Sequence, residues 1–363
     1  SHPRTFPAAF IVLTFLFLSC FYSLFVRGVP PNGDPVNYYI LAANMVDRGS
    51  ISFPAKHSYV PLAQGRDGRY YSKFAPGQSL LEVPFYYMAG AFSPRGAVEE
   101  YSYYFRYFVS VLSVPAVSAL AVVFLLLLLV ELGYGRGTAV AAAGAAAFAS
   151  ILWPYAKSGL SEPLQTCALA GAFLCAVRGR TRGGSAYPAL CGAAVGVAVL
   201  GKAACVVAGP VFLVYMLVMY RGGRGGAAMP AAVFSAVLSL FVFATLYYNY
   251  ARFGAWLDFG YSEGRDSVMG FGVSPLTGLY GLLFSPGKSV FLYSPVLLPA
   301  LAGAGRFHRR FRGESALMWC IAAVWVAVYS RWWAWHGDWS WGPRFLVPVV
   351  PLLMLPLAEP IVS

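Results

Sequence analysis

Most polar side chains of this sequence are concentrated in a few short segments that separate long apolar runs. Asp34 stands in the first such segment, in an Asn-Gly-Asp-Pro turn just after an apolar run, and Tyr38 and Tyr39 follow it. A carboxylate whose direction is fixed by a Gly/Pro turn can take a proton from an acceptor hydroxyl, as a general base does. Aspartate also caps helices well, so capping of the following helix is an alternative explanation for Asp34.

Basic residues in two further segments are suited to an anionic ligand. Arg69 and Lys73 lie in a segment from 68 to 78 that is rich in hydroxyls, and two cations among hydroxyls can hold a phosphate. Lys202 follows a glycine between two apolar runs that would otherwise be almost continuous. A cation at such a depth is costly and usually has an anionic partner, so a functional role is favoured for Lys202.

A second acidic candidate, Glu162, opens an apolar run after the turn from 157 to 161. A carboxylate in the first turn of a helix is favoured by the helix dipole, which explains Glu162 without any catalytic role. From the residues alone, the structural and the functional explanation of this position stay open.

Tryptophans dominate the segment from 331 to 344, where five of them fall within ten residues. Tryptophans at a membrane interface often serve only as an aromatic belt. Here they are interleaved with histidine, aspartate and arginine, a density that exceeds anchoring needs and suits stacking against a sugar or a prenyl chain. The candidates for binding sugar or acceptor are Tyr38, Tyr39, Trp335, His336, Asp338 and Trp341.

The elements that must position these residues are membrane helices. The chain is 59% hydrophobic and only 11% charged, whereas about a quarter of the residues in soluble domains are charged. Only a helix satisfies its backbone polar groups within one membrane segment. We predict an all-α polytopic membrane protein with about ten spans. The predicted spans lie near residues 6–26, 107–130, 138–153, 163–177, 187–200, 203–220, 228–248, 290–304, 315–331 and 345–361.

The basic residues behind the net charge of +12 lie mainly in short connections between the apolar runs. With a cytoplasmic N-terminus, the connections at 133–136, 178–182, 221–224 and 306–312 are all basic and all cytoplasmic, as the positive-inside rule requires. The charge therefore predicts topology rather than nucleic-acid binding. We expect a multi-pass protein of the cell membrane, in a bacterial cytoplasmic membrane, whose chemical segments all face outward.

Residues 28–106 are predicted to form a large external loop within a single transmembrane module that covers residues 1–363. The stretches 38–46 and 80–91 are apolar with polar interruptions, which is typical of amphipathic helices in the interfacial plane. All six cysteines lie within apolar stretches without paired spacing, which indicates neither a disulfide framework nor a zinc site. We predict neither a metal nor a cofactor.

In their order and their side of the membrane, these segments resemble the GT-C superfamily of integral membrane glycosyltransferases. The resemblance is strongest to the branch of protein O-mannosyltransferases and the lipid A aminoarabinose transferase. Asp34 stands where the family carries the acidic residue of its first external loop, and Lys73-Phe74-Ala75-Pro76 resembles the segment before its second interfacial helix. Further matches are Ser161-Glu162-Pro163, Gly201-Lys202 and the helix start Arg344-Phe345-Leu346-Val347-Pro348.

Two departures from the family pattern affect the carboxylates. Pro35 follows Asp34 where the family usually has an Asp-Glu pair, and the second acidic position is Glu162 rather than aspartate. The division of labour between the two carboxylates therefore stays open. Members of the family commonly carry more helices or a soluble C-terminal domain, so we expect the native chain to continue past Ser363.

The resemblance implies a polyprenyl-phosphate monosaccharide as donor and a lipid, glycan or protein acceptor at the external leaflet, in the cell envelope. In this scheme Asp34 deprotonates the acceptor, which attacks the anomeric carbon with inversion, and Glu162 orients the acceptor or shares the base role. The candidates for binding the donor phosphate are Lys73, Lys202, Arg344 and Arg69. We expect five of these residues to converge on one cavity at the external membrane boundary, with Tyr38, Trp335 and His336 on its walls. The five are Asp34, Lys73, Glu162, Lys202 and Arg344.

A transporter or flippase, or a non-catalytic binding subunit, for lipid-linked saccharides is the alternative. Such a protein would bind with the same cations and aromatic rings but would form no glycosidic bond. Its sequence signature is charged residues along a path through the middle of the membrane, together with paired repeats. The polar groups of this sequence gather on one face instead, which favours the enzyme.

Overall fold

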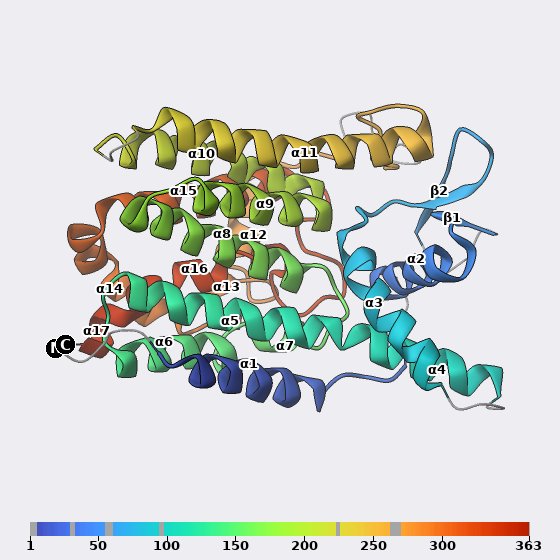
Figure 1. Ribbon diagram of the computed structural model, residues 1–363, viewed down its shortest axis with the longest axis horizontal. Helices are drawn as coiled ribbons and strands as arrows, with labels where there is room; N and C mark the ends of the chain where they lie inside the picture. Colours follow the sequence, from blue (N-terminus) through green and yellow to red (C-terminus); the bar gives the residue numbers. More distant parts are fainter. Residues whose placement is uncertain are drawn as a thin grey trace.

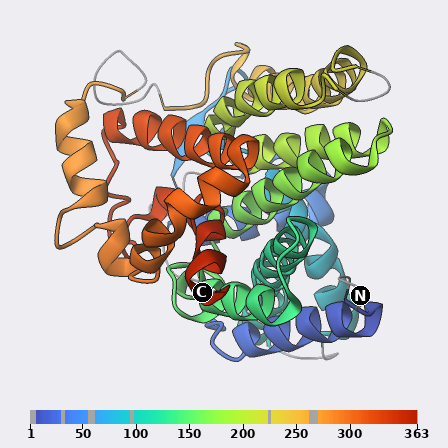
Figure 2. The same cartoon turned by 90° about the vertical axis from the view of Figure 1, so that its left-hand side faces the viewer.

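The structure, a computed structural model, describes residues 6–29, 33–54, 61–93, 98–222, 226–261 and 270–362. It is about 71% helical with almost no strands. The long helices run side by side along the long axis of the molecule, and shorter helices and a small sheet gather at one end (Figure 1). Figure 2 shows the same helices after a turn of 90° about the vertical axis.

The bundle is built from helices of both halves of the chain. The helices of its first half are α1 (Ala8–Ser23), α5 (Ser113–Glu131), α6 (Arg136–Phe148), α7 (Leu152–Tyr155), α8 (Glu162–Arg182) and α9 (Ala186–Gly201). Those of its second half are η1 (Ala203–Val207), α10 (Ala208–Met219), α11 (Ala228–Phe253), α12 (Pro275–Leu283), α13 (Val290–Tyr293), α14 (Leu297–Arg310) and α15 (Arg312–Arg331), followed by η2 (Arg344–Leu346), α16 (Val350–Leu353), η3 (Leu355–Leu357) and α17 (Ala358–Val362).

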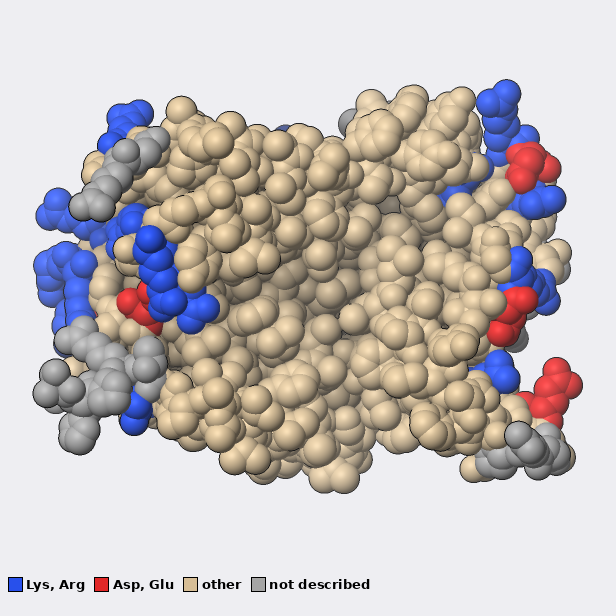
Figure 3. All heavy atoms as spheres, viewed as in Figure 1, with Lys and Arg blue, Asp and Glu red and all other residues tan. Residues whose placement is uncertain are grey.

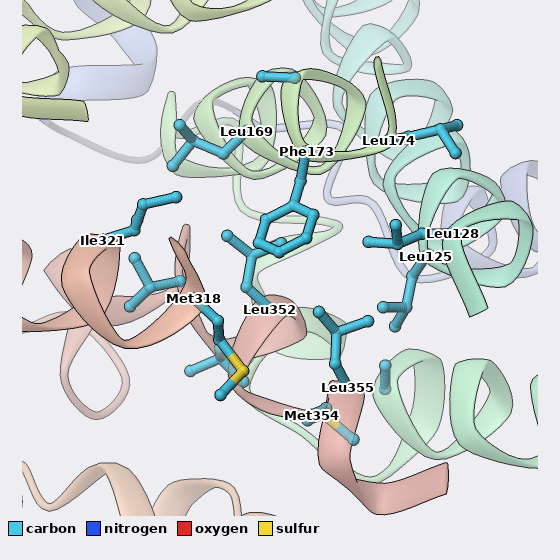
Figure 4. Packing of buried hydrophobic residues seen from close by; sticks show 14 of the residues in the cluster. Leu125, Leu128, Leu169, Phe173, Leu174, Met318, Ile321, Leu352, Met354 and Leu355 are labelled. Carbon is cyan, nitrogen blue, oxygen red and sulfur yellow. The ribbon is translucent and has the colours of Figure 1, made fainter. Parts of the chain in front are cut away.

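Helix α8 forms the centre of the bundle and packs against α5 and α9. Leu169 and Phe173 of α8 are fully buried and lie near Leu125 of α5, Ile321 of α15 and Leu352 of α16 (Figure 4). These side chains from four separate stretches of sequence belong to one continuous apolar core. The burial of a leucine or phenylalanine side chain contributes about 1.5–3 kcal/mol to the stability of the fold. The core therefore fixes the positions of the helices, and with them the positions of the polar residues at their ends.

Three helices among the described residues are long and apolar enough to cross a membrane by themselves: Glu99–Glu131, which joins α4 to α5, Ala228–Phe253 and Arg312–Arg331. Charged side chains gather at the two ends of the molecule, and the broad face between them shows almost none (Figure 3). An uncharged belt of this kind fits the hydrocarbon of a bilayer, and the chain is a membrane protein. The count of about ten spans stays a prediction.

The predicted external loop folds into a compact cap at one end of the bundle. Its helices are α2 (Asp34–Arg48), α3 (Gly77–Phe92) and α4 (Glu99–Val111), and α3 packs against both of the others. Its strands β1 (Ser52–Phe53), β2 (Leu62–Gln64) and β3 (Tyr70–Ser72) form a small antiparallel sheet in the order β1-β3-β2, which was not predicted. The two predicted amphipathic helices correspond to α2 and α3.

The segment from 345 to 361 differs from the single span that its composition predicts. It consists of the short pieces η2, α16, η3 and α17. Four prolines, at positions 348, 351, 356 and 360, explain the difference, because each removes a backbone donor and clashes with the preceding helical turn. The broken segment is nevertheless almost entirely buried and packs against α14 and α15.

The close approach of α3 to the end of α9 depends on Gly77. A Cβ atom at this position would lie 2.5 Å from the carbonyl carbon of Leu200 and 2.6 Å from the nitrogen of Gly201. Gly77→Ala should therefore destabilise the fold by about 1–3 kcal/mol, because the backbone must move apart. The matched control is Gly144→Ala in α6, where a Cβ atom would meet no atom within 4 Å. Unfolding of both variants in detergent would measure the difference, and equal stabilities would contradict this packing.

Candidate active site

A cavity of about 740 Å³ lies between the cap and the bundle. Its walls come from the start of α2, the segment before α3, the turn after α9, the end of α11, and α15 with the loop that follows it. Six charged residues line it in the described part of the chain: Asp34, Lys73, Lys202, Arg252, Asp258 and Arg344. Of the five residues expected to converge, four line this cavity directly, and Glu162 lies beside it through its ion pair with Arg344.

Arg344 joins the two acidic candidates. Its Nη2 lies 2.5 Å from Oδ2 of Asp34, and its Nε lies 2.6 Å from Oε1 of Glu162. Asp34 opens α2 and Glu162 opens α8, where the N-terminal end of the helix dipole stabilises a carboxylate. Burial alone would lower the pKa of Arg344, but Glu162 and Asp34 hold this pKa well above its ordinary value. The guanidinium is therefore permanently charged.

The two carboxylates differ in their access to the cavity. The side chain of Glu162 is only 1% exposed, whereas that of Asp34 is 22% exposed. Only Oδ2 of Asp34 is hydrogen-bonded to the guanidinium, so Oδ1 is left for a ligand in the cavity. Of the two, Asp34 is the one that can reach a substrate.

Lys202 stands where α9 ends and the backbone becomes extended for one residue. Its ammonium lies 3.9 Å from the ring centre of Phe345 and 5.5 Å from that of Tyr329. No carboxylate among the described residues forms an ion pair with it, so the aromatic faces and the cavity provide its surroundings. Burial lowers the pKa of Lys202 to about 8, against the opposing effects of Glu162 and Asp34.

Sequence reasoning missed Arg252, which is 2% exposed and lies near the end of α11. It donates hydrogen bonds to the carbonyl oxygen of Ser72, to Oδ1 of Asn249 at 2.6 Å and to the carbonyl oxygen of Tyr248 at 3.1 Å. With Thr245 and Asn249 it forms the polar face of an otherwise apolar helix. Arg252 is the single charged residue in the apolar sequence of α11, and this isolated charge was the signal that could have identified it.

Tyr38 lines the cavity next to Asp34, as predicted. Its hydroxyl donates to Oγ of Ser161 at 3.3 Å, and Nε2 of Gln165 donates to the same oxygen at 3.1 Å. Its ring packs against that of Phe74, with 5.4 Å between the ring centres. This network fixes the direction in which Tyr38 faces the cavity.

Other candidate positions lie away from this cavity. Arg69 is exposed on the hairpin between β2 and β3, 3.6 Å from Asp67, and Tyr39 packs among the aromatic rings of the cap. The expectation that Trp335 and His336 form its walls is not met, because the chain turns away after Trp333.

The loop that follows α15 explains this difference. Trp335 packs against Gly281, His336 and Asp338 lie at the surface, and Trp341 contacts the ring of Tyr293. The two tryptophans that do line the cavity, Trp332 and Trp333, come directly after α15.

The fold of this chain, a helical membrane bundle with a charged cavity beneath a helical cap, is similar to folds among the solved structures. No family model and no curated protein sequence matches the chain. The likeness is one of structure, to archaeal oligosaccharyltransferases.

Two solved structures of oligosaccharyltransferases from Archaeoglobus fulgidus, the first of them AglB, show this likeness. One is a complex with an inhibitory peptide and a dolichol-phosphate, with a TM-score of 0.62, 18% identity and 97% of this chain covered. The other is a complex with zinc and sulfate, with a TM-score of 0.61, 19% identity and 97% coverage. This chain spans about half the length of either, 50% and 49% respectively. At this identity the likeness establishes the fold.

The zinc in one of these archaeal structures raises the question whether the cavity of this chain suits a metal ion. In the described part of the chain, no three histidine, cysteine or acidic side chains come together. The carboxylates of Asp34 and Glu162 are both hydrogen-bonded to Arg344, and that of Asp258 accepts a hydrogen bond from the backbone nitrogen of Gly260. Among the described residues, no such group of three ligands fits a resident metal ion.

The buried ammonium of Lys202 makes stability depend on pH. Because its pKa falls from the ordinary 10.5 to about 8 on folding, the unfolded chain binds more protons between these two values. Stability should therefore rise as the pH increases from 8 to 10.5, by an amount on the order of 2–3 kcal/mol. Lys202→Met should lose this increase, whereas Lys157→Met, at a lysine outside the cavity, should keep it. Unfolding followed across this range would test the assignment, and an unchanged profile in Lys202→Met would refute it.

Proposed function

We propose that this protein is a glycosyltransferase that moves a monosaccharide from a polyprenyl-phosphate carrier to an acceptor at the external face of the membrane. The observation that carries this proposal is that Asp34 and four basic side chains line one cavity at the end of a membrane bundle. A carboxylate for the acceptor and cations for a phosphate are the two requirements of such a transfer. The dolichol-phosphate bound to the archaeal structure supports a lipid phosphate as the ligand.

The charges of the cavity suit a donor with one phosphate. Lys73, Lys202 and Arg252 line it without an ion pair to any described carboxylate, whereas Arg344 is engaged by Asp34 and Glu162. A sugar linked to a lipid through one phosphate carries one negative charge and gains a second when the sugar departs. Cations placed in advance stabilise that growing charge in the transition state.

The prenyl chain has a route into the cavity from the membrane. Both α11 and α15 contribute to its walls, yet α11 packs against α9 and α10 and hardly touches α15. The lining on this side is apolar and includes Ala203, Ala204, Leu257 and Val328. Only 17% of the apolar stretch of α11 is buried within the protein, so its other faces are free for lipid. We place the prenyl chain between α11 and α15.

The chemical step is a single displacement. Oδ1 of Asp34 accepts the proton of the acceptor hydroxyl or amine, while the acceptor atom forms a bond to the anomeric carbon from the face opposite the phosphate. The bond between that carbon and the phosphate oxygen breaks, and its electron pair leaves with the polyprenyl phosphate. Attack from the opposite face inverts the anomeric configuration. In this scheme Glu162 acts by holding Arg344, because it has almost no exposed surface.

The base assignment predicts a specific failure for Asp34→Asn, which keeps the shape of the side chain but cannot accept the proton. Its rate of sugar transfer should fall about 10²- to 10⁴-fold, with donor binding retained. The control is Asp67→Asn on the exposed hairpin, which should transfer at the normal rate. Transfer from a synthetic polyprenyl-phosphate sugar, with donor binding measured in parallel, would test both variants.

Two results would contradict the proposal. Near-normal turnover by Asp34→Asn would exclude Asp34 as the base. Movement of intact donor between leaflets by the unmodified protein, without formation of a glycosidic bond, would identify a flippase instead.

The proposal also fixes the orientation of the chain, with the cap outside and the N-terminus in the cytoplasm. Gln64→Cys in the cap should react with an impermeant thiol reagent in intact cells, whereas Ser185→Cys at the opposite end should not. Both positions are exposed in the structure, so access to the reagent depends on the side of the membrane. Both variants should be made in a protein in which the exposed Cys20 and Cys320 are replaced by alanine, so that only the introduced cysteine reacts. Labelling of Ser185→Cys but not Gln64→Cys would place the cavity on the cytoplasmic side.

A further inference from the structure

Helices α2 and α8 each begin with an acidic residue, and the two side chains contact the same guanidinium. Asp34 begins α2 and Glu162 begins α8, and both carboxylates lie within hydrogen-bond distance of one guanidinium. Two carboxylates so close together, one of them buried and the other partly buried, repel each other, and a cation between them favours the ionised form of both. In many enzyme sites that cation is a divalent metal ion held by carboxylate oxygens.

The guanidinium of Arg344 has the geometry for this task. Its Nε and Nη2 lie on one edge of a planar fork, so each donates to a different carboxylate. This bridging arrangement differs from the usual one, in which both donors bind one carboxylate. It directs a full positive charge between the two acids.

The position of Arg344 is fixed by its own backbone. The arginine begins η2, and its nitrogen donates to the carbonyl oxygen of Gly342 at 3.0 Å. The carbonyl oxygen of the next residue, Phe345, accepts a hydrogen bond from Nε1 of Trp325 at 2.8 Å. Gly337 packs so closely that a Cβ atom there would lie 3.0 Å from Cβ of Arg344. The side chain is thus held against the carboxylates rather than free to follow a ligand.

We infer that Arg344 is the resident cation of this site and occupies the position that a divalent metal ion would take between Asp34 and Glu162. This refines the proposed function, because it reassigns Arg344 from phosphate binding to the neutralisation and orientation of the carboxylates. Lys73, Lys202 and Arg252 are then left for the phosphate. The cation-binding test below does not depend on sugar transfer, so the two proposals can fail separately.

The inference has a direct consequence for a variant without the guanidinium. Arg344→Ala would leave the carboxylates of Asp34 and Glu162 close together, without an ion pair to any other cation among the described residues. Carboxylate oxygens are hard ligands that favour Mg²⁺ and Mn²⁺. The variant should therefore acquire a divalent cation site that the unmodified protein lacks.

The experiment is a titration of the purified full chain with Mn²⁺ alone, followed by electron paramagnetic resonance and by the thermal unfolding temperature. Arg344→Ala should bind one Mn²⁺ at least tenfold more tightly than the unmodified protein, and Mn²⁺ should raise its unfolding temperature. The double variant Arg344→Ala with Glu162→Gln should lose this gain, because one ligand is missing. Arg69→Ala, which exposes a single carboxylate at Asp67, is the matched control and should show no gain.

Two outcomes would overturn the inference. The first is a Mn²⁺ site in the unmodified protein that disappears in Glu162→Gln, because the metal would then share the site with the guanidinium. The second is a folded Arg344→Ala variant that binds Mn²⁺ no better than the double variant. If Arg344→Ala does not fold, the comparison of the unmodified protein with Glu162→Gln decides alone, and the absence of a difference supports the inference.

Discussion

The guanidinium of Arg344 ties together three parts of the chain that are far apart in the sequence. It connects the first helix of the cap, the central helix of the bundle and the loop after α15, through Asp34 and Glu162. Removing one partner of a buried ion pair typically costs about 3–5 kcal/mol, because the other charge is left unpaired. The geometry of the cavity therefore depends on this bridge, since the cap and the bundle meet at it.

The sequence allowed the residues around this bridge to be predicted because charge is rare in the chain. Asp34, Glu162, Lys202 and Arg344 stand out at the ends of apolar runs, and burying a charge is too costly to occur without a reason. The same argument predicted the helical fold. It could not assign partners, because the direction of a side chain depends on how helices pack, and the partners of Arg344 lie up to 310 positions away from it along the chain.

Three features show where sequence reasoning failed. Arg252 was hidden by its apolar neighbours, although it contributes a buried cation to the cavity. The tryptophan-rich loop was judged by composition, but its backbone turns away at Trp335, where the ring packs against Gly281. The segment after Arg344 has the composition of a span, yet its prolines break it into short pieces that only tertiary packing holds in place.

The weak contact between α11 and α15 determines how substrate would be supplied. A ligand that enters between two membrane helices diffuses in the plane of the bilayer, so its relevant concentration is the number of molecules per unit area of leaflet. Under the proposed function, dilution of the lipid by detergent or by added phospholipid would then slow sugar transfer even when the total amount of donor is unchanged. For such a protein, a Michaelis constant expressed as a mole fraction of lipid is transferable between preparations, whereas one expressed per volume of solution is not.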